Sequence, residues 1–67
     1  MRKLVNCISS IQRIMETEKV SAEVARELQE ERAYLEIDDV DTHGWELEAI
    51  SGSPEQGLVL MFKDMDA

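Results

Sequence analysis

The hydrophobic pattern of the chain changes period at Gly44, and this change constrains the fold more than any other feature. Before Gly44 the apolar residues recur every three to four positions, which is typical of amphipathic helices. From Trp45 onward they largely alternate, and residues 52–57 form a turn segment that contains Gly, Ser and Pro. The pattern therefore predicts a β-hairpin with strands at 45–51 and 57–63, preceded by helices.

The second strand of this predicted hairpin is apolar on both faces. Leu58, Leu60 and Phe62 share one face, while Val59 and Met61 share the other. A strand with two apolar faces is normally covered on both sides. Two helices and one hairpin in a chain of 67 residues cannot easily cover both faces. We therefore expect the hairpin to make a contact with another chain.

A first helix is predicted over residues 3–16. At about 100° per residue, four apolar side chains of this segment fall within about 60° of one another. They are Leu4, Ile8, Ile11 and Met15.

A second helix is predicted over residues 21–42, with Ser21 as its N-cap and Gly44 in the left-handed position that ends it. The apolar residues Val24, Leu28 and Leu35 share one face of this helix.

Ile37 and Val40 fall on the opposite side, so the helical pattern changes phase near residue 36. Either the helix is unbroken and buries both faces, one of them in an oligomer, or it is kinked near residue 36. A strand over residues 34–38 is a third alternative, because Tyr34 to Asp38 also alternate.

These elements predict a small α+β protein that forms a single domain over residues 1–67. Its two N-terminal helices form an αα-hairpin packed on a C-terminal antiparallel β-hairpin, and another chain can complete the sheet.

A chain of 67 residues is near the lower limit at which one hydrophobic core gives more than marginal stability. With Cys7 as its one cysteine, the chain can form no internal disulfide and no thiolate zinc site. Self-association is then the expected source of additional stability. Cys7 flanks the apolar stripe of the first predicted helix, so it is expected to be a buried structural thiol and not a nucleophile.

The net charge of −8 argues against direct nucleic-acid binding and against binding to anionic membranes, since both would repel the chain. The sequence has no apolar run long enough to span a membrane and no apolar signal-peptide core, which predicts a cytoplasmic protein. A basic protein surface is the partner that suits this charge. The acidic side chains concentrate on the second helix, where the predicted partner-binding face comprises Glu23, Glu27, Glu30, Glu31, Glu36, Asp38, Asp39 and Asp41.

The C-terminal half resembles a family of very small uncharacterised prokaryotic and phage proteins. The resemblance rests on the run Ile37-x-x-Val40-x-x-x-Gly44-Trp45-Glu46-Leu47, followed by a hairpin that ends in Gly57-Leu58-Val59-Leu60-Met61-Phe62-Lys63. In that family a helix ends in Gly-Trp-Glu-Leu and precedes a hairpin, and no activity is established for it. Its members usually begin with a β-strand that joins the hairpin in a three-stranded sheet. The helical pattern of residues 3–16 departs from this arrangement.

Two residues with possible chemistry stand beside the helix end. His43 follows three aspartates, which could bind a divalent ion or act as an acid–base pair, but a solvated helix C-terminus is the preferred interpretation. Trp45 suits a core position, an interface hot spot or a ligand-stacking platform. We expect no catalytic, cofactor-binding or metal-binding residues.

The sequence therefore predicts a non-enzymatic protein that oligomerises or binds other proteins. One alternative is an inhibitor, such as a phage-encoded one, whose acidic helix docks on a basic or nucleic-acid-binding site. A second is a protein that binds or sequesters a small ligand in a pocket between chains near Trp45. The residues expected at the interface are Trp45, Leu58, Val59, Leu60, Met61, Phe62, Ile37 and Val40.

Overall fold

The computed structural model describes residues 2–65, which form two helices and three strands. In chain order these are β1 (Lys3–Ile8), α1 (Ile11–Glu18), α2 (Ala22–Thr42), β2 (Trp45–Ser53) and β3 (Gly57–Asp64). No helix in this part of the chain is both long and apolar enough to cross a membrane.

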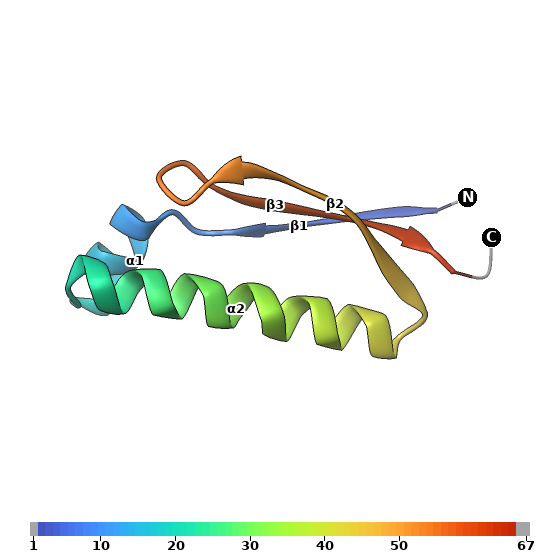
Figure 1. The fold of residues 1–67 in the computed structure, drawn as a ribbon, viewed down its shortest axis with the longest axis horizontal. Coiled ribbons are helices and arrows are strands. Elements are labelled where there is room, and N and C mark those ends of the chain that lie inside the picture. The colour runs from blue at the N-terminus through green and yellow to red at the C-terminus, as the bar shows by residue number, and fades with distance from the viewer. Residues whose placement is uncertain (1, 66–67) are drawn as a thin grey trace.

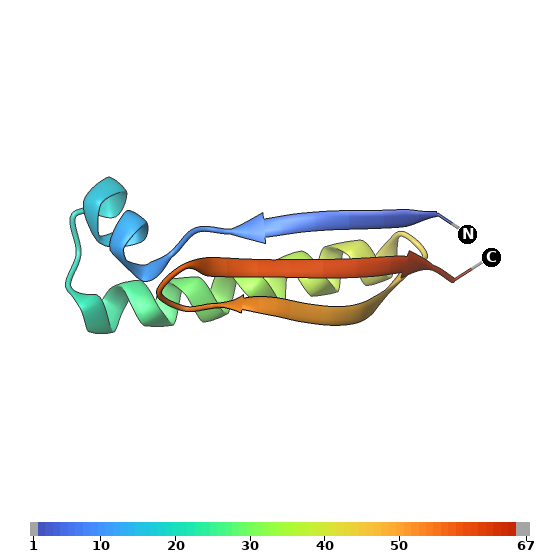
Figure 2. The ribbon, with the colours of Figure 1, turned by 90° about the horizontal axis from the view of Figure 1, so that it is seen from above.

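The fold has two layers, one a three-stranded antiparallel sheet and the other the long helix α2 (Figure 1). The strand order is β1-β3-β2, so the last strand of the chain is the central one and pairs with both neighbours. Seen from above, β1 and β2 flank β3, while α1 lies beyond the end of the sheet (Figure 2). Within residues 2–65, α2 covers one face of the sheet and no helix lies on the other.

The prediction of a helix over residues 3–16 is wrong for its first half, because residues 3–8 form β1. The error has a simple cause. Leu4 and Ile8 are four positions apart, and a spacing of four keeps two side chains on one side of both a helix and a strand. Ser10 separates the two elements, since its hydroxyl caps α1 by accepting a hydrogen bond from the N–H of Arg13 at 3.2 Å.

The third strand of the sheet therefore comes from the chain itself. The expectation that a bare hairpin needs another chain to complete its sheet is wrong, because β1 pairs along β3 from Lys3–Lys63 to Ile8–Leu58. Pairing on both edges covers neither face of β3, so its second apolar face lies on the side of the sheet opposite α2. The three-stranded sheet that the family resemblance implies is the sheet that the structure has.

Helix α2 continues without a break, so both a strand over residues 34–38 and an interruption near residue 36 are wrong. The hairpin strands and the presence of two helices are confirmed, but the expectation that both helices pack on the hairpin is wrong, because only α2 lies on the sheet and α1 lies beyond its end. The change of phase has a different explanation from the one expected. Val40 is buried against the sheet with Ile37 beside it, whereas Val24 and Leu35 are exposed by 41% and 61%. The sheet thus selects the side of α2 that carries Ile37 and Val40.

The apolar core consists of two clusters along α2. The larger one lies between α2 and the sheet, and it contains Ile8, Val40, Leu60 and Phe62. The smaller one lies between α1 and α2, and it contains Ile11, Ile14 and Ala25.

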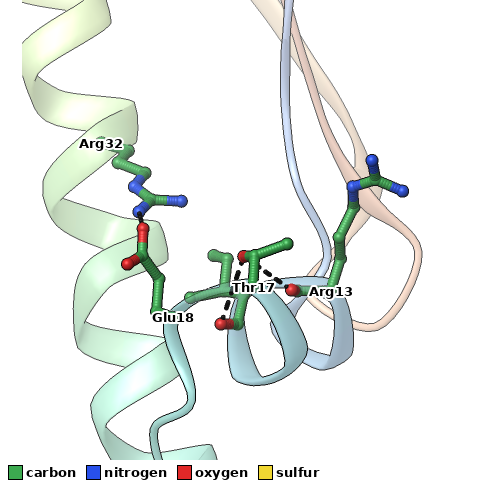
Figure 3. A network of polar contacts seen from close by, with 5 residues as sticks. Arg13, Thr17, Glu18 and Arg32 are labelled. Atoms are coloured by element: carbon green, nitrogen blue, oxygen red, sulfur yellow. Dashed lines mark hydrogen bonds and ion pairs between the residues drawn. The ribbon is translucent and has the colours of Figure 1, made fainter.

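Beside this smaller cluster, an ion pair joins α1 to α2 and a side-chain hydrogen bond forms within α1 (Figure 3). The Arg32 guanidinium on α2 contacts the Glu18 carboxylate at the end of α1, with 2.6 Å between Nη2 and Oε1. Within α1, the hydroxyl of Thr17 donates to the carbonyl of Arg13 at 2.9 Å.

Gln29 joins three parts of the fold at the end of the sheet nearest α1. Its side chain is 2% exposed, and its amide Nε2 donates to the carbonyl oxygens of Ser9 at 3.0 Å and Pro54 at 3.1 Å. The Pro54 carbonyl also accepts the backbone N–H of Ile11 at 3.0 Å. One buried amide therefore holds α2, the β1–α1 link and the β2–β3 turn together.

Candidate functional site: the open face of the sheet

The face of the sheet opposite α2, here called the open face, is built from three rows of side chains that run across the strands. The order within each row is β1, β3, β2, as the strand register gives it. The first row is Lys3, Lys63 and Glu46; the second is Val5, Met61 and Ala49; the third is Cys7, Val59 and Ser51.

The second and third rows form an apolar strip along the middle of the open face. Met61 and Val59 on the central strand are half-buried by their neighbours, while Val5 on β1 is 56% exposed. Cys7 is also exposed, so the prediction of a buried thiol is wrong. Its position on β1 explains the error, because odd-numbered residues of this strand point away from α2.

The first row is charged and balanced. Lys63 faces Glu46 with 3.6 Å between Nζ and Oε2, and Lys3 forms an ion pair with Glu48. Glu48 joins this face through an irregularity between Leu47 and Ala49, where the register of β2 shifts. The hydrogen bond from the Lys3 ammonium lowers the pKa of Glu48 below its ordinary value, with the charges of Lys3 and Lys63 acting in the same direction.

The residues expected at an interface divide between the two faces of the sheet. Leu60 and Phe62 are 0% and 1% exposed and lie in the core of the monomer, as does Val40. Ile37, Trp45 and Leu58 are half-buried and pack against the same core. Only Val59 and Met61 belong to the open face.

Trp45 lies where α2 leads into the sheet, and the Arg2 guanidinium stands 5.3 Å from its ring centroid. Its packing against the core corresponds to the core position among the alternatives for this residue. An open hollow lies elsewhere, beside α1, where Met15 and Val20 line it. Ligand binding near Trp45 therefore remains a prediction.

Of the nine residues in the three rows, sequence reasoning identified Val59 and Met61 and missed seven: Lys3, Val5, Cys7, Ala49, Ser51, Glu46 and Lys63. The signal for the first three is the alternation from Lys3 to Ile8, which the helical reading of the same segment concealed. Ala49 could not be placed on this face from the alternation alone, because the register of β2 shifts between Leu47 and Ala49.

The acidic residues of α2 gather on its outer side, away from the sheet. Six carboxylates and the Tyr34 side chain, which is 72% exposed, fall within a sector of about 100° around the helix. The six are Glu23, Glu27, Glu30, Glu31, Asp38 and Asp41, and all are exposed. Glu36 lies on the sheet side and accepts a hydrogen bond from the Asn6 amide at 3.0 Å, and Asp39 lies on the flank near His43.

His43 ends α2, with its ring Nδ1 2.8 Å from the carbonyl oxygen of Asp39. This contact is typical of a helix C-terminus. Over residues 2–65, no three His, Cys, Asp or Glu side chains are grouped so that they could hold a metal ion.

Comparisons of the chain with protein-family models, with curated proteins and with solved structures find no match.

Proposed function

We propose that this chain is a non-enzymatic, cytoplasmic protein-binding module that works as a homo-oligomer, with the open face as its contact surface. The observation that carries this proposal is the uncovered apolar strip on the central strand. Val59 and Met61 lie on a sheet face without a covering layer, and Val5 and Cys7 extend the strip to the edge. Apolar surfaces with a charged rim are typical of protein–protein contacts.

The size of the molecule supports the same proposal. The surface area of 4762 Å² exceeds the value of about 4300 Å² that scaling predicts for a compact protein of this mass. The chain is elongated, with extents of 41 × 19 × 14 Å, and a long two-layer fold leaves one sheet face in water. Association through that face would remove apolar area that the monomer cannot bury.

Sedimentation equilibrium over low micromolar to millimolar concentrations tests this function. The expected result is a concentration-dependent dimer or larger oligomer that persists at high salt, because apolar contacts are not screened. A substitution intended to disrupt the oligomer should not be made at Leu60, since this residue is fully buried in the monomer core. A chain that stays monomeric at millimolar concentration would contradict the proposed function.

A second candidate function is inhibition of a target with a basic site. Its support is the outer side of α2, where six carboxylates surround the exposed Tyr34. An aromatic side chain amid complementary charge is a common anchor in protein interfaces. The family resemblance to phage proteins agrees with this candidate but names no target.

Affinity purification from a cell lysate at low salt, followed by a binding titration of this chain against each recovered protein, tests this second function. Binding that depends on the acidic side should fall at least about tenfold in the double variant E27K/E31K and at high salt. A matched control is E55K, which changes an exposed acidic residue in the β2–β3 turn. Equal losses in both variants would argue against docking through α2.

A further inference from the structure

We propose that the open face binds a second copy of the chain about a two-fold axis parallel to β3, so that β1 of each copy lies over β2 of the other. This inference rests on the proposed function, and it names both the partner and the orientation. Two sheets packed in this way lie about 10 Å apart with their strands within about 30° of each other.

Net charge limits where a second copy can approach. The chain carries −8, and its acidic residues dominate the outer side of α2, where two copies would repel each other. The open face differs, because Lys3 and Lys63 balance Glu46 and Glu48 there. It is therefore a neutral surface on an acidic molecule, and net charge does not oppose the approach of a second copy there.

The order of charges in the first row selects the orientation. Lys3 lies on the β1 edge and Glu46 lies on the β2 edge, with Lys63 between them. Rotation about an axis along β3 exchanges the two edges and keeps the row at the same end. Lys3 of one copy then faces Glu46 of the second copy, and the reciprocal pair forms by symmetry. Lys63 lies on the axis and meets Lys63 of the second copy, but each of these ammonium groups keeps its own Glu46 carboxylate 3.6 Å away.

The other face-to-face arrangement has its two-fold axis perpendicular to the strands, and the strand register of the sheet disfavours this arrangement. An axis through Met61 would place the charged first row over the third row of the second copy. Lys3 would then lie over Cys7, and Lys63 over Val59, so charges would lose water without gaining partners. The axis along β3 instead stacks Met61 on Met61 and Val59 on Val59, where the apolar strip is continuous.

A distance between two spin labels distinguishes the two axes. Gln56 is an exposed turn residue outside the three rows, and Cys7 is the one native cysteine. In the C7S/Q56C variant, an axis along β3 brings the two labels to the same end of the dimer, below about 20 Å apart. An axis across the strands puts them at opposite ends, beyond about 30 Å apart, because each label lies five strand residues from Met61.

Two further variants test whether the open face is the contact. M61D should weaken the dimer by on the order of 100-fold or more, since it buries an unpaired carboxylate between the sheets. I50D is the matched control, because Ile50 is 52% exposed and lies opposite Leu60 on the α2 side. Circular dichroism of both variants verifies that the monomer is folded.

The outcomes separately test the proposed function, the contact surface and the two-fold axis. A monomer at every concentration would overturn the proposed function itself. A dimer that resists M61D, or that I50D weakens equally, would place the contact elsewhere and overturn this inference. A dimer that M61D dissociates but whose labels lie beyond about 30 Å would overturn the axis along β3 while leaving the proposed function intact.

Discussion

The buried side chain of Gln29 makes the polar contacts that matter most for the tertiary structure. Its buried amide donates to two carbonyl groups that belong to segments far apart in the sequence. A buried amide that makes both bonds specifies one arrangement of its neighbours, whereas an apolar side chain there would leave the carbonyl of Ser9 without this donor.

Replacement of Gln29 by leucine should lower the free energy of unfolding by about 1–3 kcal/mol, because the part-buried carbonyl oxygen of Ser9 loses its hydrogen-bond donor. Urea denaturation measures this change. The control is Q12L on the exposed side of α1, which should change stability by less than about 0.5 kcal/mol. Similar stability in both variants would mean that the Gln29 hydrogen bonds contribute little.

Two glycines allow a matched test of backbone conformation and space. Gly44 and Gly52 have φ values of +88° and +86°, yet a Cβ at Gly44 would meet nothing within 4 Å. At Gly52 a Cβ would lie 2.2 Å from the carbonyl oxygen of Gly57, which is backbone and cannot rotate away.

G44A should therefore cost about 1–2 kcal/mol for the left-handed conformation alone, and G52A about 3 kcal/mol because the turn must also move. Thermal denaturation of the two variants checks the order. A G44A variant less stable than G52A would contradict it.

At the scale of elements, β1 shows where sequence reasoning succeeds and where it stops. The helix α2, its Ser21 cap and the β2–β3 hairpin follow from local patterns, and the structure has all of them. The strand β1 does not, because Leu4 and Ile8 satisfy both periods. The strand β3 decides between the two periods, because its second edge needs a pairing partner. Its residues lie at the opposite end of the sequence from β1, so the local pattern of residues 3–8 does not contain this information.

The ion pair between Lys3 and Glu48 gives the sheet a defined dependence on pH. The pKa of Glu48 is lowered in the folded chain from its ordinary value of 4.5, so the ionised form binds Lys3 and stabilises the fold above that value. This stabilisation is lost as the pH falls through the lowered pKa.

We therefore expect E48Q to lower the melting temperature slightly at pH 6 and by a smaller amount at pH 3. The effect is small because the pair is exposed. E55Q, in the exposed turn, should show no such difference between the two pH values. A larger effect of E48Q at pH 3 than at pH 6 would contradict the expected sign.

The candidate site was only partly predictable, and the reason belongs to the same scale. The expected intermolecular contact through β3 was argued from two apolar faces, of which α2 covers one. The remaining face could not be identified before β1 was known to be a strand, since Val5 and Cys7 complete its apolar strip.

For the whole molecule, charge is the dominant unfavourable feature of the monomer. Eight acidic and two basic residues lie within α2, with Glu23, Glu27 and Glu31 spaced four apart on its outer side. Like charges at this spacing destabilise a helix, and salt screens the repulsion.

Added sodium chloride should accordingly raise the stability of the monomer, by on the order of 1 kcal/mol between low and high ionic strength. The measurement belongs in the M61D background, where dimer formation does not contribute. The double variant E27Q/E31Q should be more stable at low salt and respond less to salt. An unchanged salt response would show that the repulsion lies outside α2.

The central position of β3 also sets the order in which the chain can fold during synthesis. Strands β1 and β2 form no backbone pairing with each other in the sheet, and both pair only with β3, which is made after them. Until residues 57–64 have been added, a growing chain can form its two helices but no part of the sheet. The strand β1 therefore stays unpaired while residues 9–56 are made, and chaperones that hold extended apolar segments can bind it in that interval.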